Sequence, residues 1–128
     1  MNPIPLFHIG DFLLVSIPED LSDSMVTRLQ DSLSRKVIKL QIKGVLLDLS
    51  SVTIVDSFIG RMLGNMASIT AMLGAEAIIV GIQPAIAITM IELGLGLNNI
   101  KTALNVDQGV IMLQILAADK AIDYVSKQ

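Results

Sequence analysis

The sequence lacks cysteine entirely and is poor in histidine and aromatic residues, and each shortage excludes a class of function. Without cysteine, the chain has no disulfides and no thiolate ligands for a metal ion. The single histidine, His8, leaves little material for a histidine-based catalytic centre or zinc site. Because aromatic residues make up only 3% of the chain, aliphatic side chains must fill the core, and stacking platforms for nucleic-acid bases are missing.

Charged residues are also scarce, and their balance is slightly acidic. They account for 16% of the sequence, and nine Lys and Arg against twelve Asp and Glu give a net charge of −3. We expect no nucleic-acid partner, because such binding depends on neutralising phosphates with basic residues. Hydrophobic residues reach 52%, and we expect part of this apolar surface to serve assembly with other subunits.

The long apolar stretch from Gly60 to Leu97 raises the question of a membrane span. Arg61, Glu76 and Glu92 interrupt it before any run reaches the roughly 18 to 20 uncharged residues that a spanning helix needs. The residues after Met1 show neither the basic region nor the apolar region of a secretory signal. We therefore expect a cytoplasmic protein without membrane association.

The apolar pattern predicts strands that alternate with helices. Strand-like runs at residues 4–9 and 12–17 flank Gly10-Asp11, a two-residue connection typical of a β-hairpin. Further strands are expected at 45–49, 77–80 and 98–101, and helices at 21–40, 57–73, 84–94 and 106–125. This order predicts an α/β fold with a mixed sheet, in one domain covering residues 1–128, since crossover connections align successive strands in parallel.

Residues at the expected helix ends support these boundaries. Asp20 or Ser22 is suited to cap the first helix, and Gly74 stands where a left-handed C-terminal cap is expected. Asn105 with Gln108 three positions later resembles a capping box before the last helix.

A polar link, residues 50–56, follows the third strand and leads to a helix that begins at Ser57. The N-terminus of a helix offers unpaired N–H groups and the positive end of the helix dipole. A phosphate on Ser57 would add about two negative charges at this place and change a docking surface.

The segment around this serine resembles the phosphoacceptor region of the STAS-domain family. The resemblance is carried by the strand VLLDLS at residues 45–50 and by IVDSFIG at residues 54–60, and the agreement in layout runs from the Phe12 strand to the helix start at Asn105. It implies a STAS-like mixed sheet flanked by about four helices, with an N-terminal hairpin.

The resemblance also implies the site residues. Ser57 is then the phosphorylated residue, and Asp56, Phe58, Ile59 and Gly60 form the phosphosite neighbourhood that binds partners. Sporulation-type antagonists of this family usually have Ser-Ser-Gly or Ser-Thr-Gly after the aspartate. The bulky form found here is similar to that of the RsbS type of stressosome protein.

An RsbS-type protein is expected to catalyse nothing and to need no cofactor or metal. The resemblance implies assembly with itself and with RsbR-type STAS paralogues into a large stressosome that sequesters an RsbT-type serine kinase. Phosphorylation of Ser57 would release the kinase in a stress response, and an RsbX-type phosphatase would reset the state. The alternative is a free anti-sigma-factor antagonist of the same fold, also controlled by serine phosphorylation.

Less specific interpretations stay open beside these. Ser57 could be an ordinary helix-cap serine, and Ser51 or Thr53 could be modified instead. Asp48 invites comparison with phosphate-accepting response regulators, but the acidic pair that such receivers need after their first strand is missing, so a structural role is expected. Ser22 and Ser24, near the first helix start, are further hydroxyls that a kinase could modify.

Two other features are expected to be structural. Gly94-Leu95-Gly96 resembles part of a phosphate-binding loop, but no Lys-Ser or Lys-Thr follows it, so it is interpreted as a helix terminator. The methionines at positions 62, 66 and 72 are expected to fill the core, because Met at helical spacing usually does.

Overall fold

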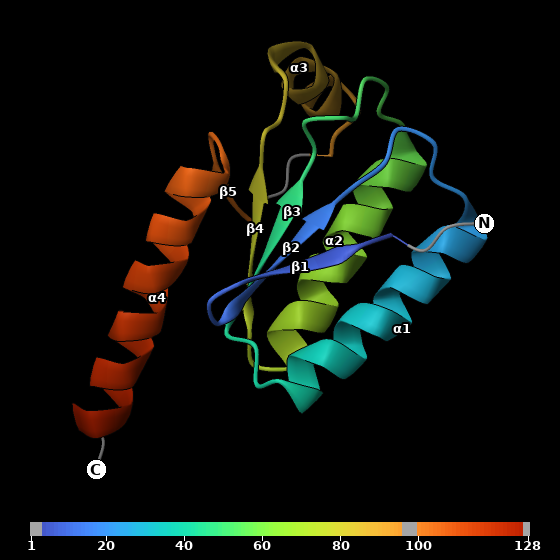
Figure 1. Cartoon of the computed structure of the whole chain (residues 1–128). Coiled ribbons are helices and arrows are strands. Elements are labelled where there is room, and N and C mark those ends of the chain that lie inside the picture. The colour runs from blue at the N-terminus through green and yellow to red at the C-terminus, as the bar shows by residue number, and fades with distance from the viewer. Residues whose placement is uncertain (1–3, 96–99, 127–128) are drawn as a thin grey trace.

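The predicted alternation of strands and helices is confirmed by the computed structural model, which describes residues 4–95 and 100–126 (Figure 1). The elements in chain order are β1 (Leu6–Ile9), β2 (Phe12–Ser16), α1 (Asp23–Lys39), β3 (Gly44–Asp48), α2 (Ser57–Met72), β4 (Glu76–Val80), α3 (Pro84–Glu92), β5 (Lys101–Ala103) and α4 (Val106–Ser126).

The strands form one mixed sheet in the order β1-β2-β3-β4-β5. β1 and β2 pair antiparallel as a hairpin, in which Gly10 takes a positive φ of 59°. Every later neighbour is parallel, and the register aligns Leu14 with Leu46 and Leu46 with Ile78. The expected N-terminal hairpin and α/β class are therefore confirmed.

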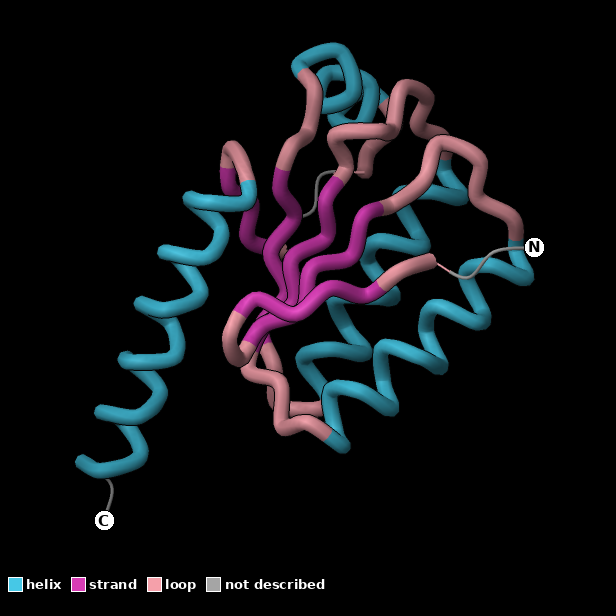
Figure 2. Tube along the Cα trace, in the orientation of Figure 1, coloured by secondary structure: helices cyan, strands magenta, loops and turns pink. Residues whose placement is uncertain are grey.

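Helices cover both faces of the sheet, with α1 and α2 on one face and α4 on the other (Figures 1 and 2). Strand β3 lies between the two layers, so its side chains are buried on both sides. Val45 and Leu47 belong to the larger core under α1 and α2, whereas Leu46 belongs to the smaller core under α4. This double burial explains why the strand is a continuous apolar run rather than an alternating one.

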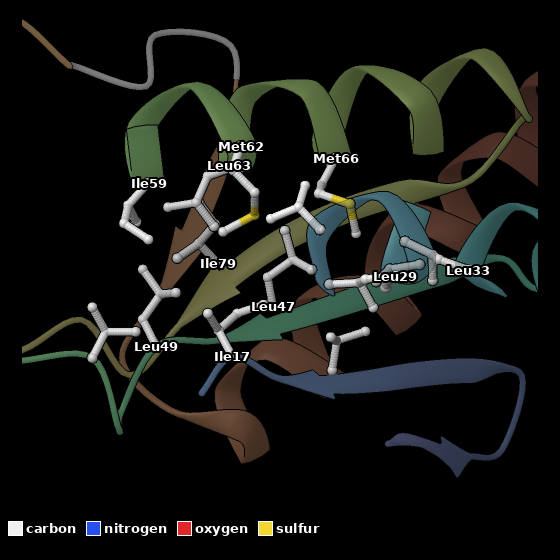
Figure 3. Close-up of a cluster of buried hydrophobic side chains, with 14 of the residues drawn as sticks. Ile17, Leu29, Leu33, Leu47, Leu49, Ile59, Met62, Leu63, Met66 and Ile79 are labelled. Atoms are coloured by element: carbon white, nitrogen blue, oxygen red, sulfur yellow. The ribbon is translucent and has the colours of Figure 1, made fainter. Parts of the chain in front are cut away.

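The larger core is aliphatic and methionine-rich, as the scarcity of aromatic residues predicts (Figure 3). Met62 and Met66 are buried in it, which confirms their expected role as core filler. Met72 is 86% exposed, so the same prediction is wrong there. Met72 is the last residue of α2 and lies on the outer side of the helix.

The helix ends agree with those predicted from the sequence, and the structure shows which of two candidate residues caps the first helix. Ser22, rather than Asp20, caps α1, since its hydroxyl accepts a hydrogen bond from a backbone N–H three residues later. Gly74 has a φ of 86°, the left-handed conformation expected after α2. Asn105 Oδ1 accepts a hydrogen bond of 2.9 Å from the backbone N–H of Gln108, as predicted.

The last strand lies later than the sequence pattern indicates. We predict a strand over residues 98–101, of which 98 and 99 lie outside the described residues, but β5 spans Lys101–Ala103 and pairs with Ile78–Val80. The prediction followed apolar Ile100, whereas β5 is an edge strand whose exposed positions are polar. The interpretation of Gly94-Leu95-Gly96 as a helix terminator is confirmed for Gly94, since α3 ends at Glu92 and Gly94 follows with a φ of 73°. Gly96 lies outside the described residues.

Candidate functional site

The carboxyl ends of the parallel strands β2, β3 and β4 meet at one edge of the sheet, at the top of Figure 1. Backbone hydrogen bonds continue the pairing into the loops. The N–H of Ile17 donates to the carbonyl of Asp48 at 3.0 Å, and the N–H of Leu49 donates to the carbonyl of Val80 at 2.9 Å. The loops that carry the candidate site therefore leave the sheet side by side.

The start of the link between β3 and α2 is held by Asp48. Its Oδ1 atom accepts a hydrogen bond of 2.9 Å from the backbone N–H of Ser50, which confirms the structural role expected for this aspartate. Gly81, in the next loop, packs against the same turn. A β-carbon built on Gly81 would lie 2.7 Å from Asp48 Oδ1, so a side chain larger than hydrogen does not fit there.

Two neighbouring loops hold the link from either side. Gln83 Nε2, after β4, donates to the backbone carbonyl of Ser50 at 2.9 Å. Thr53 Oγ1 donates to Glu19 Oε1 at 2.9 Å, and Glu19 comes from the loop after β2. Sequence reasoning identified neither Glu19 nor Gln83, because both are polar loop residues distant along the chain from their partners.

The middle of the link exposes one apolar side chain. Val52 and Val55 are buried in the core, whereas Ile54 between them is 79% exposed. Buried residues on both sides fix the backbone and direct Ile54 into solvent. An exposed apolar side chain on a fixed loop suits contact with another protein better than a mobile one, because less side-chain and loop entropy is lost on binding.

The helix after the link begins with Asp56 as its cap. Its backbone is extended, and its Oδ1 accepts a hydrogen bond of 3.0 Å from the N–H of Ile59. Ser57 is the first residue of α2 and is exposed. The interpretation of Ser57 as the helix-cap serine is therefore wrong, because Asp56 occupies that position.

The next three residues of α2 lie progressively deeper. Phe58 is half-buried against the core, and Ile59 is buried in it. Gly60 is buried, and a β-carbon on it would lie 2.5 Å from Cδ1 of Leu95. Of the predicted neighbourhood, Asp56 and Ser57 thus reach solvent, while Ile59 and Gly60 anchor the helix start.

The charges around Ser57 come from both signs. Asp56 and Glu19 are acidic, but each carboxylate accepts a hydrogen bond from within the protein. Arg61 is the single charged residue of α2; it is exposed and stands four residues after Ser57. Residues at this spacing lie on the same side of a helix, so Arg61 is within reach of a phosphate on Ser57.

A second surface feature lies around the edge strand β5. A cavity of about 640 Å³ opens between α3, β5 and α4. Three of the side chains that line it are large, apolar and exposed, namely Leu104, Ile111 and Ile115, which we call the β5-edge patch. Exposed apolar patches of this kind mark contact surfaces more often than isolated apolar residues do.

Other kinds of site find no support in the described part of the chain. Over residues 4–95 and 100–126, no cluster of three or more His, Asp or Glu side chains is arranged to hold a metal ion. Within those same ranges, no helix combines the length and apolar character required to cross a membrane. His8 is exposed on β1.

Comparison with known proteins places this geometry in a family. The family model for the STAS domain matches residues 4–109. Among curated proteins, the RsbT co-antagonist protein RsbRD of Bacillus subtilis is 30% identical over 99 residues, which are 77% of this chain and 36% of that protein. The chain therefore spans little more than a third of that relative.

Two solved structures match this chain over nearly their whole length. A serine-to-glutamate variant of RsbS from Moorella thermoacetica is 33% identical, with a TM-score of 0.79 over 91% of this chain and 99% of that one. A chain of a solved structure described as the molecular architecture of the stressosome, a signal integration and transduction hub, is 35% identical. Its TM-score is 0.78, over 88% of this chain and 98% of that one. From the family match and from its fold, this chain is a member of the STAS domain family.

Proposed function

We propose that this protein is a non-enzymatic stressosome scaffold of the RsbS type, which sequesters an RsbT-type serine kinase and releases it when Ser57 is phosphorylated. The observation that carries the proposal is the exposed position of Ser57 as the first residue of α2, after a capping aspartate and a fixed link. Similarity to RsbS over almost the full length of that protein supports it.

Phosphorylation acts here through charge. The unmodified surface presents Ile54 and the neutral Ser57 hydroxyl, a combination suited to a partner that buries both. A phosphate on Ser57 adds about two negative charges, which the amides at the start of α2 and the Arg61 guanidinium stabilise within this chain. The same charges raise the cost of burying the surface against a partner, so the kinase is released.

The other residues of the site support this switch without chemistry of their own. Asp56 fixes the first turn of α2, and Phe58, Ile59 and Gly60 hold that turn on the core. Phe58, Ile59 and Gly60 hold the docking surface in place and do not contact the kinase directly. Asp56 is next to Ser57 and borders that surface. Neither catalysis nor a cofactor is part of the proposal.

The proposed partners besides the kinase are STAS paralogues of the RsbR type and an RsbX-type phosphatase that removes the phosphate. Two curated relatives of this chain are RsbT co-antagonists, which supports assembly with proteins of that type. The β5-edge patch supplies apolar surface for such assembly. This patch favours the scaffold over a free anti-sigma-factor antagonist, which would leave it exposed.

The test uses an RsbT-type serine kinase. The purified chain is bound to the kinase, treated with magnesium ATP, and analysed by mass spectrometry and by size. Phosphate on Ser57 together with loss of bound kinase supports the proposal. Phosphorylation elsewhere, or phosphate on Ser57 without kinase release, contradicts it.

A further inference from the structure

Several hydroxyl groups at the carboxyl end of the sheet are exposed and could each accept phosphate from a kinase. Ser51, Thr53 and Ser57 lie within one short stretch, and each is exposed. Accessibility alone therefore does not explain why one of them should accept phosphate. Thr53 differs from Ser57 in the side chains that surround it.

Thr53 is held by a carboxylate. Its hydroxyl donates a hydrogen bond of 2.9 Å to Glu19 Oε1, a residue 34 positions earlier in the chain. Phosphoryl transfer from ATP forms a bond between the hydroxyl oxygen and the γ-phosphorus and breaks the bond to ADP. The hydroxyl proton passes to a base on the kinase, so the modified oxygen can no longer donate to Glu19.

Phosphorylated Thr53 would also be unfavourable in this position. A phosphate on Thr53 would put about two negative charges next to the Glu19 carboxylate, and like charges at short range repel. Ser57 has a different neighbour. The Asp56 carboxylate is turned toward the N–H of Ile59, and the helix amides and Arg61 favour an anion.

We propose that Glu19 is a specificity-determining residue that excludes Thr53 from phosphorylation by engaging its hydroxyl. This inference rests on the proposed function, because it assumes a kinase that acts on this surface. Glu19 acts through Thr53, from whose hydroxyl it accepts a hydrogen bond, and through the loop that Thr53 belongs to.

The experiment removes the preferred acceptor and asks where phosphate goes. Four variants are treated with the RsbT-type kinase and magnesium ATP: Ser57→Ala alone, and Ser57→Ala combined with Glu19→Ala, Glu19→Gln or Gln83→Ala. Phosphate on each hydroxyl is quantified by site-resolved mass spectrometry. Circular dichroism establishes that each variant is folded, which is expected because Glu19 and Gln83 are exposed.

Ser57→Ala alone should carry almost no phosphate on Thr53, and adding Glu19→Ala should raise Thr53 phosphorylation at least tenfold. Glu19→Gln keeps an oxygen that accepts the hydroxyl hydrogen bond, so its increase should be smaller than that of Glu19→Ala. Gln83→Ala loosens the other side of the same link without touching Thr53. It should leave Thr53 unmodified, which separates selection by Glu19 from general loosening of the loop.

Equal Thr53 phosphorylation with and without Glu19, no phosphate on Thr53 in either variant, or an equal rise in the Gln83→Ala variant would each overturn the inference. The wild-type chain tests the proposed function separately. Phosphate on Ser57 of the wild type with any of those results removes the role of Glu19 and leaves the switch intact. Absence of phosphate from wild-type Ser57 removes the proposed function and this inference with it.

Discussion

Gly81 and Asp48 approach each other so closely that a β-carbon on Gly81 would lie 2.7 Å from the Asp48 Oδ1 atom. The same carboxylate oxygen accepts the hydrogen bond from the N–H of Ser50 that holds the start of the link between β3 and α2. The turn after β4 and the link after β3 therefore form one packed unit, and Gly81 is the residue that lets them meet.

Substitution of Gly81 by alanine should destabilise the protein more than the same substitution at Gly94. Both glycines have a φ of 73°, where alanine costs about 1–2 kcal/mol, but only Gly81 has neighbouring atoms within reach of the added carbon. Urea unfolding of the two variants measures the difference. Equal losses of unfolding free energy would show that the contact with Asp48 relaxes at no cost.

The cap residue Asp56 should stabilise the start of α2. Asp56→Ala removes the acceptor for the Ile59 N–H and should lower the free energy of unfolding by about 1 kcal/mol. Asp56→Asn keeps an acceptor oxygen and should cost much less. Thermal unfolding followed by circular dichroism distinguishes them, and similar losses for both would mean that charge, not capping, is the contribution of Asp56.

Arg61 should stabilise a negative charge at position 57. In a double-mutant cycle of Ser57→Glu with Arg61→Ala, we expect a coupling free energy of about 0.3–0.5 kcal/mol, as for other exposed pairs four residues apart. The coupling should vanish in 1 M salt, because surface charges are then screened at about 3 Å. A cycle with Asn65→Ala in place of Arg61→Ala is the control. Coupling of equal size there would argue against an ion pair.

The β5-edge patch should be needed for assembly and not for folding. Ile111→Lys and Ile115→Lys place a charge on exposed positions of α4, so the unfolding free energy should change little. Co-assembly with an RsbR-type paralogue should be lost, as seen by light scattering. Gln114→Lys, on an exposed position of the same helix, is the matched control. Normal particles from the isoleucine variants would exclude this patch as an assembly surface.

The fold was more predictable from the sequence than the site. Periodicity identified each helix, Gly74 identified the C-terminal end of α2, and Asn105 identified the start of α4, because these signals are local. The position of β5 was missed since an exposed edge strand carries little apolar pattern. The hydrogen bond between Glu19 and Thr53 was also missed, because it joins residues that only the parallel sheet brings together.

The exposure of Ile54 could not be predicted for a related reason. Val52, Ile54 and Val55 are equally apolar in the sequence, and the three-dimensional path of the link alone determines which of them faces solvent. The position of Ser57, in contrast, followed from the helix boundary. The helix start that carries Ser57 was therefore predictable from the sequence, while the residues that hold the link before it come from the structure.

The most direct test of the central claim is the binding of an RsbT-type kinase to the Ser57→Ala and Ser57→Asp variants, measured by isothermal titration calorimetry. Ser57→Ala should retain the affinity of the unmodified protein, and Ser57→Asp should lose at least tenfold, because a charge then occupies the docking surface. Equal affinity of the two variants would contradict release of the kinase by charge at position 57.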